Sequence, residues 1–398
     1  MRQRGSRRGS RRATWRTVVL VMASVAVLLA GCGGGSSAAQ APTMPATGAT
    51  GGGTGTPGAT SSATATPAAG APVTDAYSIG QALPHYQSGP DSWAWRATLP
   101  GSRIILYYGI VGSPQGGVIG YYGGDENGLL NRLQNQGQAY AQLDPSHPVV
   151  MGLDIVDPLA DAAPQQGFYI DRMGPDILQH YLDLTRANHM LLFFDMQIGY
   201  SSMQRELTYL LPYLQYPWVN VAIDPEWDHA HNGQSEGCPG VQDNIDATGR
   251  MYASEINYVI AQLSALVIAN HLPPKTLVLH QYQYGEDPNN GGYICDNRKP
   301  SEGWQNIHPM AGVNLVINCD GVGSSLYGGL SLKLQVYSIF DHDQQIGLAA
   351  EHIPVYTAIK LYYYYPDLGL APNFYDDPQM TPQEVLALDP PPLLVMYQ

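Results

Sequence analysis

Positive charge is scarce in this chain once the N-terminus is set aside. The 398 residues contain 19 Lys and Arg against 33 Asp and Glu, and seven of the arginines lie between Arg2 and Arg16. The other 12 basic residues face all 33 acidic residues, which gives the remainder a formal charge of −21. Because a protein that binds the phosphate backbone needs the opposite sign, we expect no nucleic-acid partner.

The sequence also lacks several motifs that mark common enzyme classes. It contains no nucleophile elbow, no P-loop and no glycine-rich dinucleotide turn, which argues against esterase, nucleotide and nicotinamide chemistry. The HExxH motif of zinc peptidases is missing too, and the one HxH triplet, 229–231, lies in a polar stretch typical of a solvated loop. We therefore expect no metal and no other cofactor.

The N-terminus has the layout of an export signal. The arginine-rich start is followed by an apolar run, Thr17–Ala30, that is too short for a comfortable membrane span. The run ends in Leu29-Ala30-Gly31-Cys32, which resembles the lipobox of bacterial lipoproteins. This resemblance implies that residues 1–31 are a signal peptide and that Cys32 carries a lipid anchor on the outer face of the cell membrane. A plain secretion signal or an uncleaved anchor is the alternative.

A low-complexity segment follows the presumed lipid site. Residues 33–72 consist of small and polar residues with proline, and they include no charged or aromatic side chain. Such a segment cannot bury enough apolar area to offset its ordering entropy. We expect a flexible tether over 32–75 and a folded domain with an N-terminal extension over 76–398.

Eight apolar, β-rich runs recur across the folded part. Most are continuously apolar over four or five residues, which suits parallel strands buried on both faces. The runs cover 103–111, 148–156, 189–199, 218–227, 275–284, 312–321, 353–365 and 392–398. Helix-like segments lie between them at 125–143, 174–188, 201–214, 248–271 and from Thr381 onward, and 324–345 also favours a helix.

This alternation predicts an α/β fold of the TIM-barrel type, a (β/α)8 barrel. The alternative is an open, doubly wound sheet, which needs a glycine-rich phosphate turn after the first strand. The residues after that strand, Gly112-Ser113-Pro114-Gln115-Gly116-Gly117, lack the fingerprint.

Acidic residues end four of the runs, and TIM barrels place their chemistry at these C-terminal strand ends. The acids are Asp154, Asp195, the pair Asp224 and Glu226, and Asp320. Other candidates for substrate binding at the same ends are Trp227, His280, Gln281, Tyr282, Lys360 and Tyr362. We expect all of them to converge on one rim, with the aromatic side chains offering flat surfaces for sugar rings.

Asp224 and Glu226 are the strongest candidates for catalysis. Like charges raise each other's pKa, so one acid of a close group keeps its proton near neutral pH. Glycoside hydrolysis uses this condition, because one carboxyl group donates a proton while a second stays ionised. We expect Glu226 to be the proton donor and Asp224 to orient or tune it.

The stretch Asp224-Pro225-Glu226-Trp227 resembles the end of the strand-four motif in chitinase-like barrels, and the Asp-x-Glu of barrel-type lysozymes. The resemblance implies that Glu226 is the proton donor, and it extends to Asp224 and Glu226 alone. The chitinase motif has two further acids upstream, where this chain has Asn220 and Ala222. Over 100–398 the chain also resembles exported bacterial barrel proteins, a likeness that brings no function with it.

Two other functions remain open. Two-carboxylate retaining barrels usually place a second glutamate on strand seven, where this chain has Lys360. That departure favours a non-catalytic lipoprotein that binds a glycan or the cell wall, whereas the clustered strand-end acids favour an enzyme. The third possibility is a metal-dependent hydrolase with ligands among Asp195, Asp224, Glu226 and His280.

The cysteines are few. Three follow Cys32, and an exported location permits a disulfide while an odd number leaves one thiol free. Cys238 and Cys295 lie in polar stretches after consecutive strands, which a barrel places side by side. We expect a disulfide between them, with Cys319 as a free thiol packed inside an apolar run.

Replacing Cys32 with alanine should release the protein from the membrane fraction, because the expected lipid would have no attachment point. Fractionation of cells that produce either form measures the change, and Ser36→Ala in the tether is the matched control. Retention of the Cys32→Ala form in the membrane would mean that the apolar segment is not cleaved.

Overall fold

The computed structural model of the chain describes residues 89–161, 168–228, 251–281, 283–285, 292–294, 306–321, 323, 329–331, 333–334, 337, 355–369 and 375–398. The expected signal peptide, Cys32 and the tether lie outside these residues, so the division of the N-terminal part stays a prediction. Tyr282, Cys238 and Cys295 also lie outside them.

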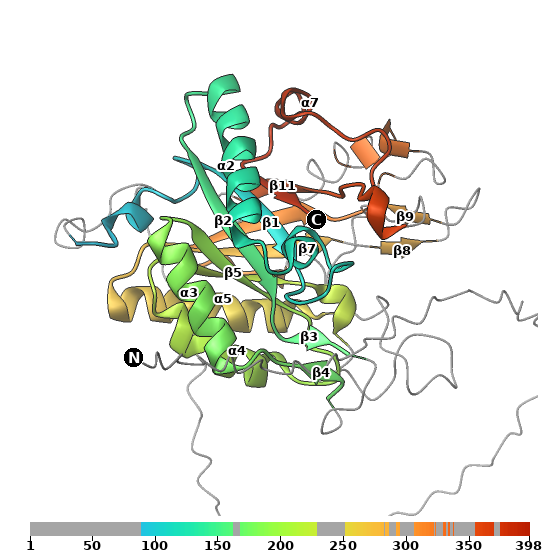
Figure 1. Cartoon of the computed structure of the whole chain (residues 1–398). Coiled ribbons are helices and arrows are strands. Elements are labelled where there is room, and N and C mark those ends of the chain that lie inside the picture. Colours follow the sequence, from blue (N-terminus) through green and yellow to red (C-terminus); the bar gives the residue numbers. More distant parts are fainter. Residues whose placement is uncertain are drawn as a thin grey trace, which may run out of the picture. The chain divides into compact units, whose positions relative to one another are not determined.

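Eight parallel strands close into a barrel (Figure 1). Strands that follow one another in the chain are neighbours in the sheet, and the last strand pairs with the first. The strands are β1 (Arg103–Gly109), β2 (Val149–Val156), β5 (Leu191–Met196), β6 (Val219–Ile223), β7 (Lys275–Gln281), β10 (Val313–Cys319), β11 (Val355–Leu361) and β12 (Leu394–Tyr397). Each predicted run contains one of them, so the predicted TIM barrel is confirmed and the open sheet is excluded.

Helices lie around the outside of the strands (Figure 1). They are α1 (Val118–Tyr122), α2 (Glu126–Leu143), α3 (Pro175–Ala187), α4 (Met203–Leu214), α5 (Ala253–Asn270) and α7 (Pro382–Leu386). Residues 329–331, 333–334 and 337 are helical as well, as predicted for 324–345. Among the described residues, none of the helices combines the length and the apolar character that a membrane span requires.

Short elements complete the described chain. Three 3₁₀ turns are η2 (Ser92–Trp95), η4 (Pro225–Trp227) and η8 (Pro366–Leu368). Two small antiparallel pairs are β3 (Leu159–Ala160) with β4 (Ile170–Asp171), and β8 (Gln283–Gly285) with β9 (Gly292–Ile294). Of these elements, η4 begins two residues after the end of β6 and carries Glu226, one of the predicted catalytic acids.

The helix starts follow from capping residues in the sequence. Asp125 accepts a hydrogen bond from the main-chain N–H of Gly128 at the start of α2. Ser202 does the same for Arg205 at the start of α4. Thr381 opens α7 with a reciprocal capping box. Each cap satisfies a main-chain donor that the helix itself leaves without a partner.

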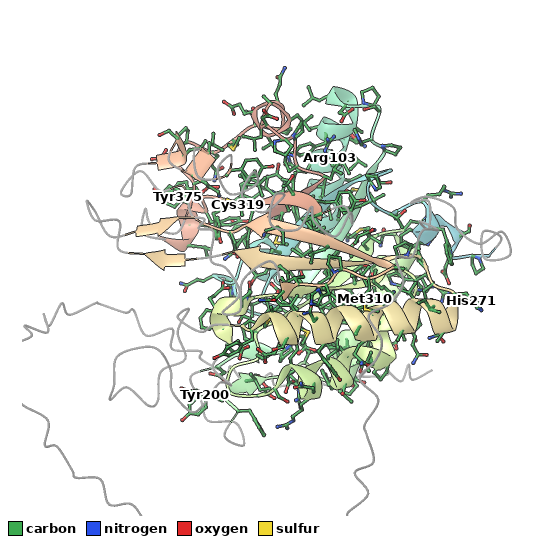
Figure 2. All side chains as sticks on the ribbon, turned by 180° about the vertical axis from the view of Figure 1, so that it is seen from behind. Arg103, Tyr200, His271, Met310, Cys319 and Tyr375 are labelled. Carbon is green, nitrogen blue, oxygen red and sulfur yellow. The ribbon has the colours of Figure 1, made fainter. Side chains whose placement is uncertain are left out.

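Apolar side chains fill the barrel and the layer between strands and helices (Figure 2). Every residue of β1, β5, β6 and β10 is buried, as expected for strands covered on both faces. The end of the barrel opposite the predicted site is tied by Arg103. Its guanidinium donates to Asp144 at 2.6 Å and to the main-chain oxygen of Pro392 at 3.1 Å.

Cys319 corrects one expectation. It is fully buried at the C-terminal end of β10 and is labelled in Figure 2, but it is disulfide-bonded rather than free. The expectation rested on the apolar neighbours of Cys319 in the sequence. Those neighbours predict that the residue is buried, but they do not predict whether another cysteine lies within bonding distance. The expected bond between Cys238 and Cys295 falls outside the described residues.

Gly152 in β2 marks a close approach between three strands. A Cβ at this position would lie 2.6 Å from Cδ2 of Leu106 in β1 and 2.8 Å from the main-chain oxygen of Leu191 in β5. The oxygen belongs to a paired strand and cannot withdraw without disturbing the sheet. Gly152→Ala should therefore lower the free energy of unfolding by about 1–3 kcal/mol, measured by denaturant titration.

The matched control is Gly124→Ala, because a Cβ there meets nothing within 4 Å. That variant should be as stable as the parent protein. Equal stability of the Gly152 and Gly124 variants would contradict the packing of β2 between β1 and β5.

Candidate active site

Five carboxyl groups gather at the C-terminal ends of the barrel strands. Asp154 lies in β2 and Asp195 in β5, while Asp224 directly follows β6, Glu226 lies in η4 and Asp320 directly follows β10. None of the five residues is more than 4% exposed. Parallel strands of a closed barrel deliver their C-terminal ends to one rim, which is why acids from distant parts of the sequence meet here.

His280 in β7 lies next to three of these acids. Its Nδ1 atom lies 2.9 Å from Oδ2 of Asp320 and 3.6 Å from Oδ1 of Asp224. Its Nε2 atom lies 3.5 Å from Oδ2 of Asp195. The imidazole is itself buried, so these carboxyl groups are its electrostatic environment.

Lys360 in β11 is the buried cation of the site. Its ammonium donates to Oδ2 of Asp320 at 3.2 Å and lies 3.6 Å from the centre of the Tyr108 ring. Burial by itself lowers the pKa of Lys360, but the nearby carboxylates, Asp320 first among them, raise it above its ordinary value. The ammonium therefore stays charged and can offset one of the buried negative charges.

Asp320 is ionised because its partners outweigh its burial. Burial alone would raise its pKa, but Lys360, His280 and the hydroxyl of Tyr362 together lower the pKa of Asp320 to about 2. The Tyr362 hydroxyl donates to the Asp320 carboxylate and also lies 3.0 Å from its main-chain oxygen. Tyr362 is buried, and its ring also lies 5.2 Å from the ammonium of Lys333 and 5.7 Å from that of Lys360.

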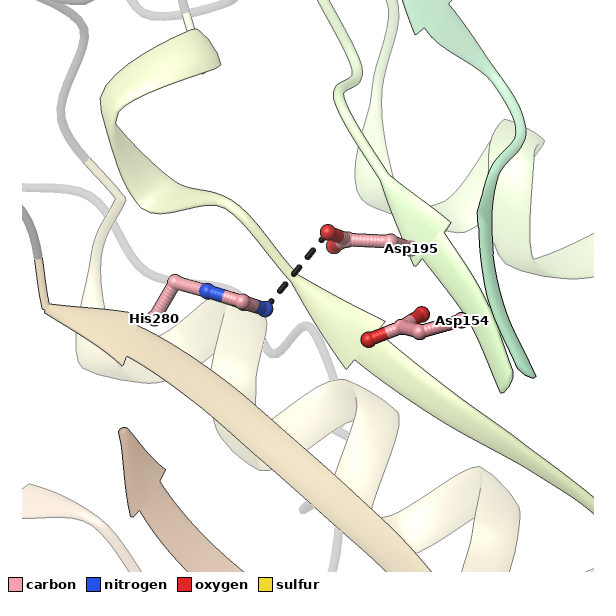
Figure 3. Close-up of side chains that lie close together, drawn as sticks. All are labelled: Asp154, Asp195 and His280. Carbon is pink, nitrogen blue, oxygen red and sulfur yellow. Dashed lines mark ion pairs between the residues drawn. The ribbon is translucent and has the colours of Figure 1, made fainter. Parts of the chain in front are cut away.

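Asp154 and Asp195 have the opposite character. Burial raises the pKa of Asp154 to about 7, with His280 and Lys360 opposing the shift and Asp224 and Asp320 adding to it. Burial followed by the charges of Asp224 and Asp154 holds the pKa of Asp195 well above its ordinary value. Figure 3 shows the two carboxyl groups side by side, both facing the His280 ring.

Asp224 and Glu226 stand on either side of a proline that fixes the turn. Pro225 has no N–H and begins η4, so the strand ends at Ile223 and Asp224 is the residue between strand and turn. Oδ2 of Asp224 accepts a hydrogen bond from Gln197 at 2.9 Å. Burial, followed by the charges of Asp224 and Asp320, raises the pKa of Glu226 well above its ordinary value. Glu226 therefore holds its proton more tightly than an ordinary glutamate, while its neighbour is held by a donor.

The structure says less about the remaining predicted residues, Trp227, Gln281 and Tyr282. Trp227 is half-buried at the end of η4. Gln281 is the last residue of β7, and only its main chain is described. Tyr282 lies outside the described residues. The structure thus places Asp154, Asp195, Asp224, Glu226, His280, Asp320, Lys360 and Tyr362 together, and leaves the stacking role of Trp227 and Tyr282 as a prediction.

Three residues of the site were missed by the sequence analysis. Tyr108 offers its ring to Lys360, Gln197 holds Asp224, and the Asn318 side chain lies 3.1 Å from Nδ1 of His280. Tyr108 lies within an apolar run that carries no mark of a polar role. Asn318 was hidden in the same way, two residues before Asp320, where alternation along a strand puts both side chains on one face.

A second buried network, formed by Lys333 and Asp376, holds the main chain of β11 at Lys360. Lys333 donates to the main-chain oxygen of Lys360 at 2.6 Å and to both carboxylate oxygens of Asp376 at 3.1 Å. Asp376 also accepts from the main-chain N–H groups of Gly323 and Tyr362. The position of Lys360, and with it that of Tyr362, is therefore fixed by charged residues that the strand pattern does not reveal.

Comparison with known proteins adds no family to this picture. No protein-family model matches the chain, and no curated protein matches it as a relative. What the fold and the geometry define is a class: an α/β barrel whose C-terminal rim holds a buried cluster of carboxyl groups around one histidine and one lysine. Function has to be argued from that cluster.

Lys360→Met should destabilise the protein, because the Asp320 carboxylate would lose its cation while remaining buried. Removing one partner of a buried ion pair costs about 3–5 kcal/mol, which denaturant titration can measure. The double variant Lys360→Met/Asp320→Asn removes both charges and should recover most of this loss. If the single variant is as stable as the parent, the ion pair is not what balances Asp320.

Proposed function

We propose that this protein is a lipid-anchored, extracytoplasmic glycoside hydrolase that acts on a polysaccharide or a cell-wall glycan. Glu226 donates a proton to the glycosidic oxygen. Asp224 lies beside it, orients it and tunes its acidity. The other acids of the rim, Asp154, Asp195 and Asp320, hold substrate hydroxyls or stabilise the positive charge that develops on the sugar ring in the transition state.

The observation that carries this proposal is the environment of Glu226. A carboxyl group acts as a general acid at neutral pH only if it still holds its proton, and burial next to other carboxylates provides that condition. Oε2 of Glu226 accepts no hydrogen bond from any described residue, although the side chain is only 4% exposed. A buried carboxyl oxygen without a protein partner can carry a proton and donate it to a substrate.

The location follows from the other end of the chain. The arginine-rich start, the short apolar run and the lipobox-like ending at Cys32 support export and lipid attachment. The net negative charge favours a neutral or basic ligand over a phosphate polymer. A glycan of the cell envelope meets both conditions, and half-buried Trp227 next to Glu226 offers an aromatic surface for it.

One observation favours a second candidate function, a non-catalytic glycan-binding lipoprotein. The position on β11 where two-carboxylate retaining barrels usually have a glutamate is occupied by Lys360, which is paired with Asp320. A site without that second acid can hold a sugar without cleaving it. The two candidates differ in one measurable quantity, which is turnover.

Glu226→Gln should lower hydrolysis by about 10²- to 10⁴-fold, the usual contribution of a general acid, while glycan binding persists. Wild-type activity should fall as the pH rises through the raised pKa of Glu226, because the donor then loses its proton. Burial, Asp224 and Asp320 raise this pKa, while Lys360 and the glutamate's own main-chain N–H lower it. Turnover on peptidoglycan, chitin and other glycans, measured against pH, gives both results.

The control is Glu126→Gln, an exposed glutamate at the start of α2 whose side chain is 45% accessible. It should leave turnover unchanged. Wild-type turnover in the Glu226 variant would remove the proton-donor assignment. Binding of a glycan by the wild-type protein with no turnover on any substrate would favour the non-catalytic lipoprotein instead.

A further inference from the structure

Asp154, Asp195 and His280 share a feature that proton donation by Glu226 does not explain. All four carboxyl oxygens of Asp154 and Asp195 are buried, and none accepts a hydrogen bond from the described part of the chain. The Nε2 atom of His280 is buried and makes no hydrogen bond within the same residues. These atoms face one another across the rim (Figure 3).

Such an arrangement costs free energy unless something else compensates the charge. A buried polar group without a partner is unfavourable, and a buried carboxylate without a cation is more so. Lys360, the lysine whose charge acts on both carboxyl groups, already donates to Asp320 and lies over the Tyr108 ring. Two carboxyl groups on neighbouring strands β2 and β5 are therefore left to a proton or to a metal ion.

The orientation of His280 favours the metal. Its Nδ1 side faces Asp320, a carboxylate that also receives the Lys360 ammonium and the Tyr362 hydroxyl. A carboxylate so surrounded acts as an acceptor, so Nδ1 carries the proton and donates it. The Asn318 amide lies 3.1 Å from the same nitrogen, and with this tautomer it turns its oxygen, which has no other described partner, toward the ring. The lone pair of the ring is then on Nε2, which points toward Asp195. Metal-binding histidines are commonly held in this way by a carboxylate on the other ring nitrogen.

We propose that Asp154, Asp195 and Nε2 of His280 bind one divalent metal ion, with Zn²⁺ as the best match. One ligand atom from each residue lies within 4.8 Å of the others. Two ligands of a tetrahedral zinc ion lie about 3.4 Å apart, given bond lengths of 2.0–2.2 Å. The distance from Nε2 of His280 to Oδ2 of Asp195 is 3.5 Å, already that of a coordination edge.

The donor set decides between metals and between sites. Imidazole suits zinc, copper, iron and nickel, of which zinc also takes carboxylate ligands in tetrahedral sites, whereas calcium and magnesium favour oxygen ligands alone. A second triad of Asp224, His280 and Asp320 also has its ligand atoms within 4.8 Å. That triad uses Nδ1, which is engaged with Asp320, and the Lys360 ammonium lies 3.2 Å from the same carboxylate oxygen. A cation there would repel the lysine.

Three protein ligands leave a tetrahedral ion with an open position, as in catalytic zinc sites. The ion would neutralise Asp154 and Asp195 and offer that position to an oxygen atom of the substrate, such as a sugar hydroxyl. This inference goes beyond the proposed hydrolysis and stands or falls separately from it, because metal binding is measurable without any glycan.

The test uses the full chain, purified in detergent and stripped of metal with a chelator. Titration with ZnCl₂, followed by calorimetry and elemental analysis, should show one bound ion per chain. Asp154→Asn and Asp195→Asn should each weaken zinc binding at least about 100-fold, since each removes a ligand rather than an outer support. Zinc should raise the unfolding temperature of the parent protein and not of these two variants.

The matched control is Asp157→Asn. Asp157 is another buried aspartate, one residue beyond β2, but its carboxylate accepts from the main-chain N–H of Met173 at 2.9 Å. This variant should bind zinc as the parent does. Co²⁺ bound to the parent protein should also give the absorption bands of a tetrahedral site, a readout that does not depend on whether any variant folds.

Each result separates the two proposals. Absence of stoichiometric zinc and of tetrahedral cobalt bands in the parent protein would overturn the metal site, and so would parent-like affinity in both ligand variants. Glu226→Gln should bind zinc normally while losing hydrolysis. Zinc binding without glycan turnover would leave the metal site standing and remove the hydrolase, whereas turnover by protein that cannot bind zinc would do the reverse.

Discussion

The constraint that governs this protein is the burial of five carboxyl groups at one end of the barrel. Water cannot solvate these groups, so the surrounding side chains determine which of the acids are ionised. The ammonium of Lys360 and the hydroxyl of Tyr362 settle the matter for Asp320. Glu226 and the pair Asp154 and Asp195 receive no such help, and they are therefore the groups available for chemistry or for a cation.

This division of the rim explains the support around it. Lys333 and Asp376 form a buried pair whose lysine also holds the main chain at Lys360. The cation of the site is therefore supported by a second buried pair, which holds its main chain in place beside Asp320. Separating a neutralised half of the rim from an uncompensated half is how one fold presents an ionised carboxylate and a protonated one in the same small space.

The fold could be predicted from the sequence because a strand that is buried on both faces is apolar at consecutive positions. The same apolar runs predicted the positions of the strand-end acids, because a run ends just before Asp224 and another just before Asp320. The contacts could not be predicted in this way. Tyr108 and Asn318 lie inside apolar runs, and periodicity treats them as core residues. The disulfide at Cys319 was missed for a related reason. An apolar run predicts that a residue is buried, but it does not predict which distant segment of the chain lies next to that residue.

The pairing of the last strand with the first sets a demand on how this chain reaches its native state. Arg103 and Pro392, which are hydrogen-bonded at the seam between β1 and β12, are 289 positions apart in the chain. Contacts of such long range are slow to form, because the intervening chain loses much entropy before they bring any gain. Until β12 arrives, β1 and β11 remain open edges that can pair with another molecule. We therefore expect efficient refolding only at low protein concentration, with aggregation competing at the step that closes the barrel.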